Sequence, residues 1–256
     1  MYKRQVQSSI DPTLQHAAEV AVQTGLSAME EQYPATKGAQ AALIALRASD
    51  GAIVAMVGGR SYTATSFNRS AHAHRHAGST VKPFLALTAL ERGLVTPATL
   101  LEDEPLTRTV DGKDWTPQNA DGTFEGAVTV RRAMERSRNI PMVHLSERLG
   151  LRALQTSLNA VGLSKATALP SSALGAFDTT PLQLASAYTV FPAGARATPY
   201  LIQSVDGQSH AGKPGGRLPT LTVANADAVA LTTDMLRGVV TRGTGRGLQD
   251  LSLIHI

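Results

Sequence analysis

The segment Gly78-Ser79-Thr80-Val81-Lys82-Pro83, followed by an apolar run from Phe84 to Leu90, constrains the local fold more than any other feature of the chain. Proline is tolerated in a helix only in the first turn, where backbone N–H groups have no intrahelical partner. A helix over this segment must therefore begin at or beside Ser79, with residues 84–90 as its buried continuation. Because positions i and i+3 are neighbours on a helix, Ser79 and Lys82 then share one face.

This spacing has a chemical consequence. A lysine beside a serine can relay the serine's proton and make the hydroxyl an acylatable nucleophile. Desolvation and the helix macrodipole both favour a neutral Lys82 in a first turn. Farther along the chain, Ser137-Arg138-Asn139 supplies a candidate proton shuttle and a contact for a substrate amide. A site of this kind also requires Lys-Thr-Gly, and the 256 residues contain no such sequence.

Composition narrows the class of protein. With 43% hydrophobic residues in 256, the chain can build a sizeable core as one large domain. Zero cysteines exclude disulfides and thiolate metal sites, and no apolar run is long enough to cross a membrane. The formal charge is only +4 and aromatic residues make up 4%, so the sequence predicts no nucleic-acid partner.

Local signals predict helices and one hairpin. Asp11-Pro12 is typical of a capped helix start, and Asp50-Gly51 between two short apolar runs predicts a β-hairpin. Further helices are expected over residues 129–136, 141–149, 151–161, 178–191 and 225–240, a strand over 200–205, and loops over 58–78 and 96–119. The predicted fold class is α+β: a helical subdomain with an antiparallel sheet of which mainly the first hairpin is present.

Together these residues resemble the transpeptidase domain of class A penicillin-binding proteins, most of all the penicillin-binding protein 1B branch. The segments that carry the resemblance are Ser9 to Gln15, Met56 to Gly59, Gly78 to Pro83, Trp115 to Asn119, Ser137 to Val143, Thr180 to Leu182 and Arg242 to Arg246. The resemblance implies a fold like that of serine β-lactamases and penicillin-binding transpeptidases, with the C-terminal strands missing.

The resemblance also implies roles for individual residues, and it implies no cofactor and no metal. Ser79 would be the nucleophile that attacks D-Ala-D-Ala stem peptides, and Lys82 its general base. Ser137 would pass a proton to the leaving D-alanine, and Asn139 would bind the substrate amide and hold Lys82. Candidate substrate-binding residues are Gly78, Trp115 and Asn119, although for Trp115 a role as a packing anchor or groove wall is favoured over a cofactor contact.

The implied partners are peptidoglycan stem peptides on lipid II-derived glycan strands, β-lactam antibiotics and regulators of wall synthesis. The parent protein would be membrane-anchored at the periplasmic face of the bacterial inner membrane and would also carry a glycosyltransferase domain. These expectations rest on family analogy.

The two ends of the sequence match translations of one sequencing adapter in its two orientations. We therefore expect residues 1–5 and 251–256 to be adapter artefacts, residues 6–40 a linker and N-terminal helix, and residues 41–250 an incomplete transpeptidase domain. Without Lys-Thr-Gly, such a fragment is expected to have little or no activity.

Two rival functions remain at this point. A serine β-lactamase shares both serine motifs but needs a glutamate downstream of Ser-x-Asn to activate a hydrolytic water. The last glutamate here is Glu147, and none lies between Arg148 and Asp250. A non-catalytic β-lactam sensor would be expected to lack the nucleophile or the lysine, and both are present.

The alternating His72, His74 and His76 are interpreted as a solvated loop rather than a metal site, since no matched ligand set accompanies them. The glycine-rich segment Gly243 to Gly247 does not meet the context of a phosphate-binding loop.

Overall fold

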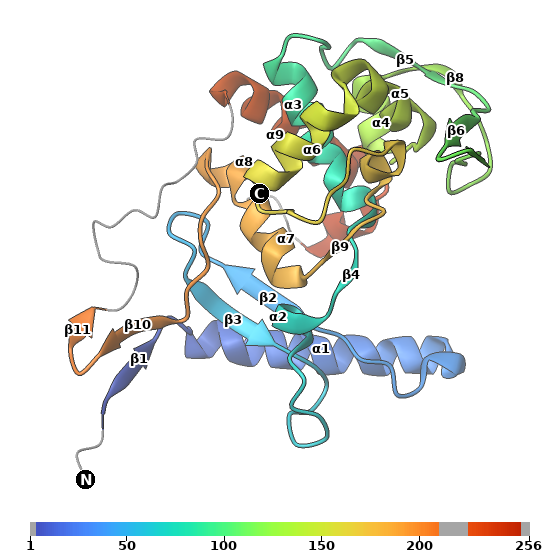
Figure 1. Cartoon of the computed structure of the whole chain (residues 1–256). Coiled ribbons are helices and arrows are strands. Elements are labelled where there is room, and N and C mark those ends of the chain that lie inside the picture. Colours follow the sequence, from blue (N-terminus) through green and yellow to red (C-terminus); the bar gives the residue numbers. More distant parts are fainter. Residues whose placement is uncertain (1–3, 210–224, 252–256) are drawn as a thin grey trace. The chain divides into compact units, whose positions relative to one another are not determined.

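A computed structural model describes residues 4–209 and 225–251 of the chain (Figure 1). The chain divides into two compact units, each of them discontinuous in sequence. The first comprises residues 1–75 and 179–223, and the second residues 76–178 and 224–256. Of the predicted adapter-derived ends, residues 1–3 and 252–256 lie outside the described part. Arg4 and Gln5 both approach the carboxylate of Asp206.

The first unit is built around a long helix and a hairpin. Helix α1 (Pro12–Gln32) begins as predicted, because the Asp11 side chain accepts the backbone N–H groups of Thr13 and Leu14. Strands β2 (Leu43–Leu46) and β3 (Ile53–Val57) form the predicted antiparallel hairpin. Figure 1 shows α1 lying along this hairpin, and buried apolar side chains join the two: Ala18, Val22, Leu26, Ala55 and Val57.

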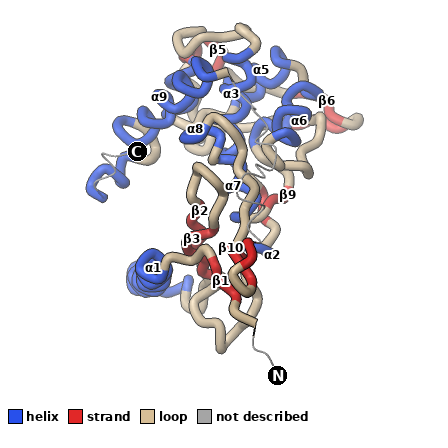
Figure 2. Tube along the Cα trace, turned by 90° about the vertical axis from the view of Figure 1, so that its left-hand side faces the viewer, coloured by secondary structure: helices blue, strands red, loops and turns tan. Residues whose placement is uncertain are grey.

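A second small sheet in this unit joins the beginning of the chain to residues far along it. Strand β1 (Val6–Ser8) pairs antiparallel with β10 (Ile202–Val205), which pairs with β11 (Gln208–Ser209) (Figure 2). The Ser9 hydroxyl lies 2.8 Å from the Ile53 carbonyl oxygen and 3.1 Å from that of Tyr200. The remaining elements of this unit are the short helices η1 (Pro34–Thr36), α2 (Arg69–His72), α7 (Pro181–Tyr188) and α8 (Val190–Ala193).

Helices dominate the second unit, as the sequence predicted. They are η2 (Gly78–Val81), α3 (Lys82–Glu91), α4 (Val130–Glu135), α5 (Ile140–Leu149), α6 (Leu151–Ala160), η3 (Pro170–Leu174), α9 (Ala226–Arg242) and η4 (Arg246–Leu251). Helix α3 is buried along almost its whole length, which explains its uninterrupted apolar sequence. It contacts α5, α6 and α9, and so forms the centre of this unit (Figure 1).

Two predicted loops contain regular structure. The segment 96–119 was expected to be loop, but it contains the strands β5 (Leu100–Asp103), β6 (Arg108–Val110) and β7 (Lys113–Trp115). Strand β5 pairs with β8 (Gly126–Thr129), and β6 pairs with β7. The loop prediction was wrong here because strands of three or four residues leave almost no periodic signal. The predicted loop 58–78 likewise contains α2, and two-residue strands β4 (Arg75–His76) and β9 (Asp178–Thr179) occur where the chain passes between units.

Within the part of the chain that the structure describes, no helix combines the length and the hydropathy needed to cross a lipid bilayer.

Candidate active site

Lys82 is the centre of a polar cluster in the second unit. Its Nζ atom donates hydrogen bonds to the Ser137 carbonyl oxygen at 2.7 Å, to the Ser137 Oγ at 3.1 Å and to the Asn139 Oδ1 at 2.7 Å. Lys82 is the first residue of α3, whereas Ser137 and Asn139 lie between α4 and α5. The structure therefore brings together three of the residues that the sequence singled out. An ammonium group has three hydrogens, and all three have acceptors here.

The Lys82 ammonium is almost completely removed from water, with 2% of the residue exposed. Burial, together with the nearby positive charge of Arg138, lowers the pKa of Lys82 to about 8. A substantial fraction of such a lysine is neutral near physiological pH. The amine can then accept a proton, as a general base must.

Ser79 lies one turn before this lysine, on the 3₁₀ helix η2 rather than on the α-helix itself. The sequence placed the start of the α-helix at or beside Ser79, but α3 begins at Lys82, with Pro83 in its first turn. The Lys82 backbone N–H donates to the Ser79 carbonyl oxygen, which is the hydrogen bond of a 3₁₀ turn. Side chains three residues apart eclipse in such a turn. Ser79 and Lys82 therefore still share one face, and the Ser79 side chain is exposed.

The Ser137 backbone has an unusual conformation. Its φ angle is +52°, in the left-handed region that residues other than glycine rarely adopt. The Ser137 N–H donates to the Met134 carbonyl oxygen, and the Arg138 N–H donates to that of Ala133. The chain thus reverses tightly at the end of α4. This reversal aims both the carbonyl and the hydroxyl of Ser137 at Lys82.

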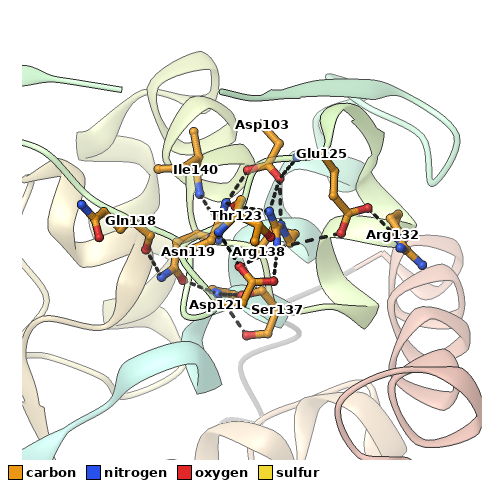
Figure 3. Close-up of polar contacts among 12 residues, drawn as sticks. Asp103, Gln118, Asn119, Asp121, Thr123, Glu125, Arg132, Ser137, Arg138 and Ile140 are labelled. Carbon is orange, nitrogen blue, oxygen red and sulfur yellow. Dashed lines mark hydrogen bonds and ion pairs between the residues drawn. The ribbon is translucent and has the colours of Figure 1, made fainter. Parts of the chain in front are cut away.

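Ion pairs of Arg138 hold this chain reversal in place (Figure 3). Its guanidinium contacts the Asp103 carboxylate at 2.7 Å and that of Asp121 at 2.8 Å, and it also donates to the Thr123 carbonyl oxygen. Asp103 has no exposed surface at all. A buried ion pair of this kind is stable only while each charge keeps its partners. Nothing in the sequence predicted the pairing of Asp103 with Arg138. They lie on separate elements, and no local signal joins them.

Asn119 makes four hydrogen bonds within the protein. Its Oδ1 accepts the backbone N–H groups of Asn139 at 2.7 Å and Ile140 at 3.4 Å. Its amide group donates to Asp103 and to the Thr123 carbonyl oxygen. These bonds use both donors and both acceptor positions of a buried side chain. Asn119 thus supports the Ser137–Asn139 segment from within the protein. Its contact with a substrate stays a prediction.

The other two candidate substrate-binding residues lie in different settings. Gly78 has a φ angle of +59° and directly precedes Ser79, so a left-handed residue leads into the η2 turn. Trp115, at the end of β7, is half-buried and packs against the cluster formed by Leu106, Ile140 and Val143.

The three alternating histidines do not assemble a ligand set. Among the described residues, no three His, Cys, Asp or Glu side chains converge in a way that could hold a metal ion. His76 has one carboxylate near it, that of Asp178 at 3.8 Å.

With this geometry established, comparison with known proteins decides the family. Residues 41–256 match the sequence profile described as the penicillin binding protein transpeptidase domain. The chain belongs to this family. It is 34% identical over 226 residues to penicillin-binding protein 1A of Neisseria cinerea, covering 81% of this chain and 27% of the relative. It is 36% identical over 248 residues to penicillin-binding protein 1B of Vibrio cholerae, covering 94% of this chain and 31% of the relative. The domain is therefore of the class A type, and it spans less than a third of the curated relatives' length.

Solved structures agree with the fold. The crystal structure of penicillin-binding protein 1A from Haemophilus influenzae matches with a TM-score of 0.62 and 34% identity, over 68% of this chain and 26% of that one. The PonA1 protein of Mycobacterium tuberculosis in complex with penicillin V matches with a TM-score of 0.68 and 24% identity, over 92% of this chain and 62% of that one. At that identity, the PonA1 match shows the α+β transpeptidase fold and nothing more specific.

Proposed function

We propose that this domain is a serine D,D-transpeptidase in which Ser79 is acylated by D-Ala-D-Ala stem peptides of peptidoglycan. The observation that supports the proposal best is the buried Lys82, held by Ser137 and Asn139, with a pKa lowered to about 8. A lysine kept only for stability gains nothing from a pKa lowered toward physiological pH. A lysine that must take a proton from a serine requires it.

In the proposed reaction, the Ser79 Oγ attacks the carbonyl carbon of the penultimate D-alanine while neutral Lys82 takes the hydroxyl proton. The Ser79 backbone N–H, in the first turn of a helical segment, stabilises the developing oxyanion. As the peptide C–N bond breaks, Ser137 passes a proton to the leaving D-alanine amine. The amine of a second stem peptide then attacks the acyl-enzyme, which forms the cross-link and releases Ser79.

The same chemistry makes β-lactams inhibitors. Attack by Ser79 would open the β-lactam ring, with its C–N bond broken, the ring nitrogen protonated and the whole drug left bound as an ester. In the full-length parent we propose a membrane-anchored wall synthase that works in the periplasm, with a glycosyltransferase domain like those of bifunctional class A proteins. Wall-synthesis regulators are its proposed partners.

Contacts of Glu147 weigh against the β-lactamase alternative. This last glutamate of the sequence accepts two hydrogen bonds from Arg108, at 2.7 Å and 2.9 Å, one on each carboxylate oxygen. A carboxylate engaged in this way is poorly suited to activate a hydrolytic water. We therefore expect the acyl-enzyme to persist for hours rather than turn over.

Mass spectrometry of the chain incubated with penicillin V tests the proposal. The expected result is a slowly formed adduct of the full drug mass, located on Ser79 and absent in Ser79→Ala and Lys82→Met. Absence of any adduct on the chain extended by the Lys-Thr-Gly strand of a class A relative, or an adduct on Ser79→Ala, would overturn the proposal. Rapid loss of the adduct would favour a β-lactamase instead.

A further inference from the structure

The backbone of Gly175 lies directly against that of Gly78, the residue before Ser79. The Gly78 N–H donates to the Gly175 carbonyl oxygen at 3.1 Å, and the neighbouring Ala77 N–H donates to the Phe177 carbonyl oxygen at 3.0 Å. Two main-chain hydrogen bonds thus join residues 175–177 to the chain just ahead of the nucleophile. We call residues 170–177 the glycine seat.

Only glycine fits at position 175. A Cβ built there would lie 2.2 Å from the carbonyl oxygen of Gly78, 2.3 Å from its nitrogen and 2.7 Å from its Cα. All three are backbone atoms, which cannot rotate away as a side chain can. Gly175 also has a φ angle of +70°. Because Gly175 has no side chain, the backbone that leads to Ser79 can approach the glycine seat this closely.

The glycine seat also touches the other half of the site. Leu174 packs against the cluster of Leu106, Ile140 and Val143, the last two of which lie on α5, the helix that begins immediately after Asn139. Helix η3 of the seat contacts η2, α3 and α5. One short segment is therefore in contact with the turn that carries Ser79, the helix that carries Lys82 and the helix that follows Asn139. Such a segment can fix the spacing between nucleophile and base.

We infer that Gly175 is a positioning residue for Ser79. Because Gly175 has no side chain, the Gly78 backbone can approach it closely, and this approach places the Ser79 hydroxyl beside the Lys82 cluster. The inference rests on the proposed function for the meaning of that placement. The close approach of the two glycines is a structural fact that stands without it. A misplacement of about 1 Å can cost on the order of 100-fold in rate when a reaction depends on alignment.

The test compares Gly175→Ala with Gly93→Ala in the full chain. Gly93 also has a left-handed backbone, with φ +64°, but a Cβ there meets nothing within 4 Å. Both variants carry the same kind of left-handed backbone cost. Only Gly175→Ala pushes on Gly78. We expect penicillin V to acylate Gly175→Ala about 100-fold more slowly than wild type, and Gly93→Ala at nearly the wild-type rate.

A second readout does not depend on acylation. In spectra of the ¹⁵N-glycine-labelled chain, which has 22 glycines, the Gly78 amide should shift and lose protection from hydrogen exchange in Gly175→Ala but not in Gly93→Ala. If wild type is not acylated even when extended by the Lys-Thr-Gly strand, the proposed function fails and the Gly78 amide alone decides the inference. An unshifted Gly78 amide, or wild-type acylation by folded Gly175→Ala, would overturn it.

A softer variant covers the case in which Gly175→Ala does not fold. Leu174→Ala loosens the packing of the seat on α5 without introducing a clash, and Leu151→Ala, at the start of α6, is its partly buried control. We expect acylation of Leu174→Ala to fall roughly 10-fold, with a smaller effect in Leu151→Ala, since alignment is perturbed only in the former. Equal rates in the two variants would contradict the inference.

Discussion

The side-chain oxygen of Asn119 accepts the backbone N–H of Asn139 at 2.7 Å. A residue outside the Ser137-Arg138-Asn139 segment thus holds the backbone of Asn139 in place, and with it the point from which the Asn139 side chain projects. Asn119→Ala removes this acceptor and leaves the backbone N–H groups of Asn139 and Ile140 unpaired. Each unpaired group lowers the free energy of unfolding by up to about 1–3 kcal/mol.

We therefore expect Asn119→Ala to lower the rate of Ser79 acylation about 10–100-fold and to lower the midpoint of thermal unfolding. Asn159→Ala, on the exposed face of α6, is the control and should change neither quantity. Intact protein mass spectrometry and a thermal unfolding curve measure both effects. An Asn119→Ala variant as reactive as Asn159→Ala would show that Asn119 does not support the site.

The lowered pKa of Lys82 predicts the pH dependence of acylation. Below about pH 8 the lysine carries its proton and cannot accept another, so the rate should rise with pH and level off above that value. The second-order rate constant for penicillin V, measured from pH 6 to 10, gives the midpoint. NMR of ¹³Cε-labelled lysine titrates the same group directly. A midpoint near the ordinary lysine value of about 10.4 would contradict the prediction.

Removing the charge of Arg138 should both destabilise the fold and change Lys82. In Arg138→Met the fully buried Asp103 loses its ion pair, and breaking a buried pair costs about 3–5 kcal/mol. The pKa of Lys82 should rise, because a neighbouring positive charge that lowers it is gone. Urea unfolding and the lysine titration check the two effects. Arg152→Met, at an exposed position on α6, should affect neither.

Two helix glycines should respond to alanine in opposite directions. Gly25, within α1, has open space where a Cβ would lie, so Gly25→Ala should stabilise the protein by about 0.5–1 kcal/mol. Gly238, within α9, would place its Cβ 2.2 Å from the Glu135 Oε1, which accepts a hydrogen bond from Arg242.

Gly238→Ala should therefore destabilise the protein by about 1–3 kcal/mol despite the better helix propensity of alanine. The two free energies of unfolding, measured in urea under one set of conditions, settle the comparison. A stabilising Gly238→Ala would mean that the Glu135–Arg242 contact readily gives way.

The absence of Lys-Thr-Gly from the 256 residues predicts slow acylation. A missing oxyanion donor typically costs about 10²–10³ in rate. Extending the chain by the Lys-Thr-Gly strand of a class A relative should recover a factor of that order. The same extension carrying Ala-Thr-Ala instead should recover much less. If the unextended chain reacts as fast as the extended one, the second donor contributes nothing to acylation here.

Those parts of the fold that depend on local chemistry could be predicted from the sequence. Asp11-Pro12 and Asp50-Gly51 each occur at the element boundary that they indicate, because capping and turn geometry involve only a few neighbouring residues. Pro83 placed the helix start within one turn. It could not reveal that the first turn is a 3₁₀ helix.

The contacts that shape the site could not be predicted in the same way. Asp103 with Arg138, and Gly175 with Gly78, are brought together by tertiary packing between elements that are remote in sequence. No pattern in a single sequence marks such pairs. Asn119 illustrates this: the family resemblance implied contact with a substrate, but no local pattern predicted its four hydrogen bonds within the protein.

The pairing of β1 with β10 has a consequence for biosynthesis. Residues 6–8 are translated before residues 76–178, but their partner strand at 202–205 is completed only after them. At about 5–20 residues per second, strand β1 waits on the order of 10–40 s with its edge unpaired. Most of the unit that carries Ser79 is synthesised in this interval. A nascent chain of this topology must postpone closure of the first unit until then.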